Sequence, residues 1–148
     1  MKIWFDMDGT LADLYAVEGW LDKLRAYDPT PYAEAAPLLR LNTLARALNR
    51  LSRKGVFIGI VSWLSKSSTP EYDMAVTLAK MKWLKKHLPS VKWDAIKIVP
   101  HGTPKSEVAE IGIHDVLFDD EENNLMEWDE NGGWGLPPAE MMDFLRSV

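Results

Sequence analysis

Short apolar runs alternate with amphipathic segments along the chain. Four short runs are mostly apolar and β-prone, and they predict four strands: 3–5, 56–61, 95–99 and 115–118. The run 56–61 shows no polar alternation, which is typical of a central parallel strand covered on both faces. Leucines and methionines at helical spacing predict two amphipathic helices between the strands, with these apolar positions: Leu41, Leu44, Leu48 and Leu51, then Met74, Leu78, Met81 and Leu84.

Two shorter helices complete the pattern, one starting near Pro104 and one covering about 139–146. The glycine- and proline-containing segment 131–138 before the last helix is expected to be a loop or a short last strand. Strands joined through helices of this length form a parallel sheet with right-handed crossovers. The sequence therefore predicts an α/β fold, a three-layer Rossmann-like arrangement with a central parallel sheet and helices on both faces.

The segment 14–37 interrupts the alternation of strands and helices. Val17, Trp20, Leu21 and Leu24 fall on one helical face, and the prolines of the sequence 28–31 end this helix before a second short piece. This segment is too small to have its own core. We expect a single domain, 1–148, with residues 14–37 as a small helical lid over the end of the first strand. Three aromatic residues of the lid either touch a substrate or pack the lid onto the body: Tyr15, Trp20 and Tyr32.

Composition narrows the chemistry that the chain can perform. The 148 residues include no cysteine, which excludes disulfides, thiolate metal sites and a cysteine nucleophile. The net charge of −5 disfavours long nucleic acid as a partner, although it allows a local phosphate pocket. The first strand begins directly after the N-terminus, and no apolar run approaches the ~20 residues that cross a bilayer. We expect a cytoplasmic protein without a membrane partner.

Two carboxylates follow the first predicted strand. Alternate residues of an extended chain point the same way, so Asp6 and Asp8 leave the chain on one side. Like charges this close require a cation or a raised pKa, and Mg²⁺ favours oxygen ligands and substrate phosphate. Gly9 permits a tight turn whose N–H groups could face an anion, and Thr10 adds a hydroxyl. An ordinary acidic turn is the alternative for this stretch alone.

The other strands also end at or just before chemically useful side chains. Ser62 follows the second strand, Lys105 follows the third, and Asp119 and Asp120 follow the fourth. Because ligands bind at the carboxyl ends of parallel strands, these residues are expected to meet at one edge of the sheet. A group of lysines on the second amphipathic helix is expected to have no substrate role, because a lysine-rich helix end is usually solvated: Lys80, Lys82, Lys85 and Lys86.

These side chains fit phosphoryl transfer. In this hypothesis Asp6 attacks the phosphorus of a monoester and becomes an aspartyl phosphate. Asp8 gives a proton to the leaving alkoxide and later takes one from the water that hydrolyses the intermediate. Ser62 and the backbone N–H of Trp63 hold a phosphate oxygen, while Lys105 adds positive charge.

The same hypothesis includes a magnesium site. Mg²⁺ is expected to be held by Asp6, the backbone carbonyl of Asp8 and one acid of the pair Asp119 and Asp120. Asp119 is favoured as the direct ligand because it lies nearest the strand end, with Asp120 behind it. Asn124 is a candidate for a supporting hydrogen bond.

The four strand ends resemble the four motifs of the haloacid dehalogenase-like (HAD) superfamily. The matching residues, in the order of the family, are Asp6-Met7-Asp8-Gly9-Thr10, Ser62, Lys105 and Leu117-Phe118-Asp119-Asp120. The resemblance implies the HAD fold and Mg²⁺-dependent hydrolysis through an aspartyl phosphate. The dehalogenase members of the superfamily lack the second aspartate, whereas the phosphatases and phosphomutases have it. The presence of Asp8 therefore resembles the latter groups.

A closer similarity is to the 5'(3')-deoxyribonucleotidase branch of that superfamily. It rests on Asp6-Met7-Asp8-Gly9, Leu11-Ala12-Asp13, the helix containing Ala79-Lys80-Met81-Lys82-Trp83-Leu84 followed by His87-Leu88, and Phe118-Asp119-Asp120. This similarity implies nucleoside monophosphates as the small phosphorylated substrate.

Other functions remain open from the sequence. The chain could act on another small phosphoester or on a polynucleotide end, and its acidic balance weighs against the latter. It could also be a phosphorylation-sensing receiver domain, but receivers resemble a different order of motifs, with the lysine last. A HAD-like subunit that binds without turnover is the remaining alternative.

Overall fold

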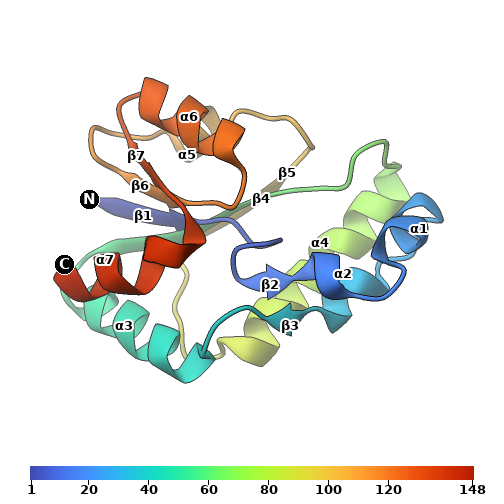
Figure 1. Ribbon diagram of the computed structural model, residues 1–148, viewed down its shortest axis with the longest axis horizontal. Helices are drawn as coiled ribbons and strands as arrows, with labels where there is room; N and C mark the ends of the chain where they lie inside the picture. Colours follow the sequence, from blue (N-terminus) through green and yellow to red (C-terminus); the bar gives the residue numbers. More distant parts are fainter.

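The computed structural model describes residues 1–148 and contains a five-stranded sheet in the order β5-β4-β1-β6-β7 (Figure 1). All neighbouring strands in this sheet are parallel. The strands are β1 (Lys2–Phe5), β4 (Phe57–Trp63), β5 (Ala95–Val99), β6 (Val116–Phe118) and β7 (Trp134–Leu136). The predicted α/β fold with a central parallel sheet is confirmed, and the uncertain segment 131–138 supplies a fifth, edge strand.

Helices cover both faces of the sheet (Figure 1). They are α3 (Leu41–Arg53), α4 (Pro70–His87) and α7 (Met141–Ser147) on one side, and α5 (Lys105–Ala109) and α6 (Glu122–Glu130) on the other. A 3-10 turn, η2 (Pro138–Glu140), leads into α7. Alternate residues of β1 serve the two layers: Ile3 and Phe5 join the cluster with α3, α4 and α7, whereas Trp4 joins the cluster with α5 and α6.

The predicted lid segment lies between β1 and α3 in sequence and beyond the end of the sheet in space (Figure 1). Its elements are η1 (Leu14–Ala16), α1 (Trp20–Arg25), α2 (Thr30–Glu34) and β3 (Ala36–Pro37). Strand β2 (Ala12–Asp13), directly before the segment, pairs with β3 in an antiparallel arrangement. The helix expected to carry both Val17 and Leu24 is shorter than predicted, because Gly19 adopts a left-handed conformation and α1 begins only after it. The division of the chain into one domain with a lid stays a prediction.

The lid segment packs on α4. Leu14 and Tyr32 share a buried cluster with Val76 on α4, and the hydroxyl of Tyr72 on α4 donates to the carbonyl of Asp28 at 2.9 Å. The hydroxyl of Tyr32 also hydrogen-bonds Ser65 in the loop after β4. These contacts fix the segment over the carboxyl ends of the strands.

The expected orientation of α4 was wrong. Of the four residues predicted to face the core, Leu84 is buried, but Met74, Leu78 and Met81 are exposed. The other residues that the helix buries are Tyr72, Val76, Ala79, Lys80 and Trp83. Both faces of the helix carry apolar residues, so the spacing alone could not decide which face packs inward. Neither α4 nor any other helix combines the length and the apolar character that a membrane crossing requires.

Candidate active site

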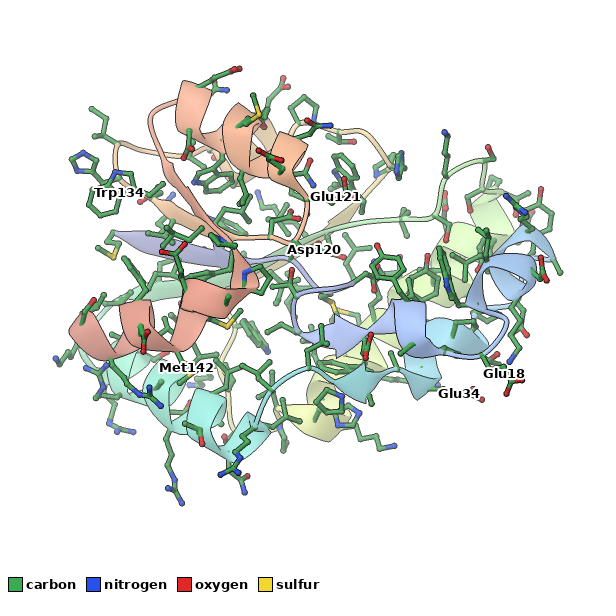
Figure 2. All side chains as sticks on the ribbon, in the orientation of Figure 1. Glu18, Glu34, Asp120, Glu121, Trp134 and Met142 are labelled. Atoms are coloured by element: carbon green, nitrogen blue, oxygen red, sulfur yellow. The ribbon has the colours of Figure 1, made fainter.

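The register of the sheet brings the acidic motifs together. Phe5 pairs with Ile60 on one side and with Phe118 on the other, so Asp6 and Asp119 follow at adjacent strand ends. The backbone N–H of Asp6 donates to the carbonyl of Phe118 at 2.9 Å. Figure 2 shows Asp120 and Glu121 where the sheet ends toward the lid, with Trp134 at the opposite end.

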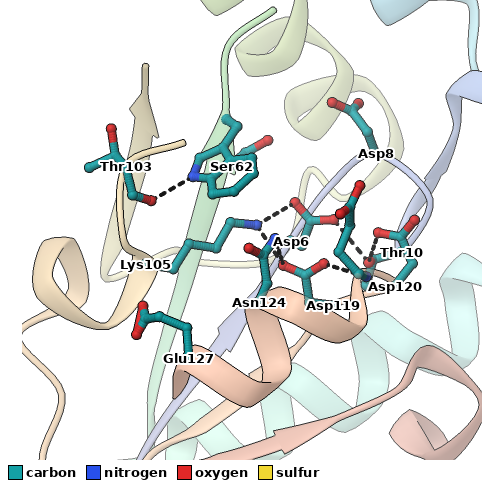
Figure 3. A network of polar contacts seen from close by, with 12 residues as sticks. Asp6, Asp8, Thr10, Ser62, Thr103, Lys105, Asp119, Asp120, Asn124 and Glu127 are labelled. Carbon is teal, nitrogen blue, oxygen red and sulfur yellow. Dashed lines mark hydrogen bonds and ion pairs between the residues drawn. The ribbon is translucent and has the colours of Figure 1, made fainter. Parts of the chain in front are cut away.

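Lys105 lies between the two acidic strand ends (Figure 3). Its Nζ is 2.9 Å from Oδ1 of Asp6 and 2.6 Å from Oδ2 of Asp119, and the side chain is 2% exposed. Burial by itself would lower the pKa of Lys105, but the carboxylates of Asp6 and Asp119 outweigh it and raise the pKa above its usual value. The lysine is therefore a fixed positive charge next to the predicted nucleophile.

Asp119 is fully buried and held by several donors. Besides Lys105, the side-chain amide of Asn124 donates to Oδ2 at 3.1 Å, and the backbone N–H of Glu121 donates to Oδ1 at 2.9 Å. The supporting hydrogen bond expected from Asn124 is present. With both oxygens of Asp119 engaged, its carboxylate has a fixed orientation.

Asp6, Asp119 and Asp120 form a compact carboxylate cluster. One oxygen from each lies within 4.8 Å of the others, a separation that a single cation can bridge. Burial and the nearby Asp6 raise the pKa of Asp119 to about 6 and that of Asp120 to about 8. Such crowding of oxygen ligands fits Mg²⁺ binding, because the ion would offset this repulsion.

The turn after β1 contacts two members of this cluster, Asp6 and Asp120. Gly9 has φ +80°, and a Cβ there would overlap the carboxylate of Asp120, so the position requires glycine for its conformation and for space. The hydroxyl of Thr10 is buried and donates to Oδ2 of Asp6 at 3.1 Å. This contact favours a role for Thr10 in holding Asp6 rather than in direct contact with substrate.

The predicted anion-facing N–H groups of this turn are not available. The N–H of Gly9 donates to the carbonyl of Ala12 at 2.8 Å, and the N–H of Thr10 donates to the carbonyl of Met7 at 3.1 Å. The turn is closed by its own backbone hydrogen bonds, so this expectation was wrong.

Lys80 is the site residue that sequence reasoning missed. It was expected to be solvated, but its side chain is 1% exposed and its Nζ donates to Oδ2 of Asp8 at 2.9 Å, Oγ of Ser62 at 2.7 Å and the carbonyl of Trp63 at 2.6 Å. Three acceptors match the three donors of an ammonium group. The available signal was its position on the helix, on the same face as Val76 and Trp83.

Lys80 affects the pKa of Asp8 and the hydrogen bonding of Ser62. Burial raises the pKa of Asp8, the charge of Lys80 lowers it, and Asp6 raises it again, with a net increase above the usual value. Asp8 stands apart from the cluster of Asp6, Asp119 and Asp120 (Figure 3). Ser62 is fully buried and accepts from Lys80, which leaves its hydroxyl proton free to donate.

Trp63 contributes both backbone and side chain. The next residue, Leu64, donates its N–H to Val99 on β5, and successive N–H groups of a strand point to opposite sides. The N–H of Trp63 therefore faces the side of β1. Its indole donates to the carbonyl of Thr103 at 2.8 Å, and its ring lies 4.8 Å from that of His101.

A cavity of about 680 Å³ opens above these residues. Its floor includes Asp6, Asp8, Lys105, Asp119 and Asp120, and its walls include residues of the lid segment and of the loop after β4. Aromatic and basic side chains line the upper part: Tyr15, Trp20, Tyr27, Tyr32, Trp63, Arg25 and Lys66. The volume is in the range that small-molecule sites occupy.

Comparison with solved structures agrees with this fold. The chain is similar to a D,D-heptose 1,7-bisphosphate phosphatase from B. bronchiseptica complexed with magnesium and phosphate, with 15% identity and a TM-score of 0.57. The match covers 91% of this chain and 79% of that chain. A D,D-heptose 1,7-bisphosphate phosphatase from Burkholderia thailandensis gives 16% identity and a TM-score of 0.56 over 89% and 74% of the two chains.

Sequence comparisons gave no match, either to protein-family models or to curated proteins. At 15% and 16% identity, the structural likeness concerns the fold. The chain therefore has the α/β fold that these two phosphatases share.

Proposed function

We propose that this protein is a Mg²⁺-dependent phosphomonoester hydrolase of the HAD superfamily that works through an aspartyl phosphate on Asp6. The observation that carries the proposal is the placement of Asp6 on the floor of the cavity, between Lys105 and the acids after β6. The likeness of the fold to two phosphatases, one of them with bound magnesium and phosphate, supports it.

The proposed reaction has two steps. An oxygen of Asp6 attacks phosphorus, the ester P–O bond breaks, and Asp8 donates a proton to the leaving alkoxide. Water then attacks the phosphorus of the aspartyl phosphate and gives its proton to Asp8, which releases phosphate and restores Asp6. The raised pKa of Asp8 favours the protonated form that the first step needs.

The remaining residues position the phosphoryl group. In this proposal the hydroxyl proton of Ser62 and the N–H of Trp63 donate to one phosphate oxygen, and Lys105, which lines the cavity, offsets the negative charge on another. Asp6, the backbone carbonyl of Asp8 and Asp120 would hold Mg²⁺, which supplies positive charge between the nucleophile and the phosphate. Asp120 replaces Asp119 as the favoured direct ligand, because Lys105, Asn124 and Glu121 already engage both oxygens of Asp119.

We propose nucleoside monophosphates as the substrates, as the resemblance to deoxyribonucleotidases implies. Two aromatic pairs near the mouth of the cavity support a planar leaving group, which can stack on aromatic rings. Tyr15 and Trp20 of the lid segment have ring centroids 5.0 Å apart, and Trp63 lies against His101 on the other wall. A sugar phosphate is the second candidate, favoured by the likeness to the heptose bisphosphate phosphatases.

A cytoplasmic location and the lack of a long nucleic-acid partner stay predictions from the sequence.

The test is phosphate release from nucleoside monophosphates, sugar phosphates and a 3′-phosphorylated oligonucleotide, with Mg²⁺ or with EDTA. We expect turnover that requires Mg²⁺ and is abolished in Asp6→Asn, but kept in Asp143→Asn, whose side chain is 91% exposed. The preferred substrate decides between the two candidates. If folded protein that binds Mg²⁺ releases phosphate from none of them, the hydrolase assignment fails for these substrates, and a stable aspartyl phosphate would favour a sensing role.

A further inference from the structure

Helix α4 carries an apolar stripe on the side that faces away from the protein. Met74, Leu78 and Met81 are 70%, 58% and 41% exposed. At about 100° per residue, they lie one turn apart on one face, while Lys80 enters the active site from the opposite face. Isolated exposed apolar residues are ordinary, but three in a row on one helix form a surface that water solvates poorly.

Charged residues of opposite sign lie at the two ends of this stripe. Glu71 is exposed in the first turn of α4, and Lys82 and Lys85 are exposed toward its end. All three share the face of Leu78, so the surface runs from acidic through apolar to basic over about 21 Å. Such a surface is complementary to itself when reversed.

We propose that α4 pairs with α4 of a second copy of this chain in an antiparallel arrangement, with the twofold axis at Leu78. Leu78 then packs on its own counterpart, Met74 lies near the partner's Met81, and Glu71 faces the partner's Lys85. The helix dipoles also oppose each other in this arrangement. A parallel pair would instead place Lys85 against the partner's Lys85.

The contact area predicts the strength of the association. One helix face is smaller than the ~800 Å² per partner of a standard interface, so the dimer should form reversibly with concentration. The exposure of Met74, Leu78 and Met81 shows that this face of α4 is accessible. The proposal is independent of the enzymatic function.

Sedimentation velocity over a concentration series tests the proposal. Wild-type protein should shift from 16.8 kDa toward twice that mass between about 1 µM and several hundred micromolar, as expected for a small interface. Leu78→Glu should stay monomeric throughout, with an unchanged circular dichroism spectrum. Ile113→Glu is the matched control, because Ile113 is 80% exposed outside α4, and it should dimerise like the wild type.

Charge reversal tests the orientation. Glu71→Lys and Lys85→Glu should each weaken dimerisation several-fold, and the double variant should restore it because opposite charges face each other again. A wild type that is monomeric at every concentration would overturn the proposal and leave the stripe to a different partner. A dimer that survives Leu78→Glu, or a double variant no better than the single ones, would also overturn it.

Discussion

At the scale of single residues, Lys80 connects the chemistry to the stability of the site. Its ammonium group is buried against Asp8, Ser62 and the carbonyl of Trp63, and its Nζ lies 5.0 Å from the ring centre of Tyr32 on the lid segment. One charge therefore orients the proposed acid and base, fixes the proposed phosphate-binding hydroxyl and contacts the lid.

Removal of this charge should be costly. In Lys80→Met the aliphatic chain is kept, but Asp8 loses its counter-ion and Ser62 loses its donor, so we expect a loss on the order of 3 kcal/mol in the free energy of unfolding at pH 7. Lys82→Met, two residues further on the exposed face, should change it by no more than about 0.5 kcal/mol. Urea denaturation measures both, and equal effects in the two variants would contradict the assigned role of Lys80.

The residues at strand ends could be predicted because their position follows from local pattern. Asp6, Ser62 and Asp119 each follow a short apolar run, and parallel strands must bring their carboxyl ends to one edge. Lys80 could not be found this way. Its role depends on which face of α4 packs inward, and that is decided by the tertiary contacts of Trp83 and Val76 rather than by spacing.

At the scale of elements, the local sequence pattern predicts the strands but not the course of the lid segment. The strand 95–99 was predicted with its observed bounds, because a short β-prone run bounded by turns is a local feature even with Lys97 inside it. The lid segment has no such run, and the helical spacing from Val17 to Leu24 is only partly realised, because α1 begins at Trp20. Its course is set by Gly19 and by hydrogen bonds to α4, such as the contact between Tyr72 and Asp28, which join residues far apart in sequence.

The packing of β4 against β1 leads to a second stability prediction. A Cβ at Gly59 would lie 2.7 Å from the ring of Trp4 and 2.9 Å from that of Phe57. Gly59→Ala should therefore lower the free energy of unfolding by about 1–3 kcal/mol through overpacking. Gly112→Ala, where the nearest atom would be 3.5 Å away, should be neutral or slightly stabilising. Thermal unfolding compares the two variants, and a neutral Gly59→Ala would contradict the close packing of these rings.

At the scale of the whole molecule, the carboxylate cluster couples stability to pH. Folded pKa values of about 6 for Asp119 and about 8 for Asp120 exceed the usual 3.8, and burial raises the pKa of Asp8 as well. Between the unfolded and folded pKa values the folded state binds more protons, so the free energy of unfolding falls as pH rises. The metal-free protein should lose stability from about pH 4 to about pH 8.

Mg²⁺ should oppose this loss, because it binds the ionised carboxylates of the folded state. In EDTA we expect a lower thermal midpoint at pH 8 than at pH 5. Mg²⁺ at about a hundred times its dissociation constant should raise the midpoint at pH 8 by on the order of 5–10 °C. The increase should be smaller at pH 5, where protons compete with the ion for the proposed ligand Asp120. Asp120→Asn should flatten the pH dependence in EDTA and reduce the Mg²⁺ effect, whereas the exposed Asp143→Asn should match the wild type. An equal Mg²⁺ effect at both pH values, or one retained in Asp120→Asn, would show that the ion binds elsewhere than the cluster at the end of β1 and β6.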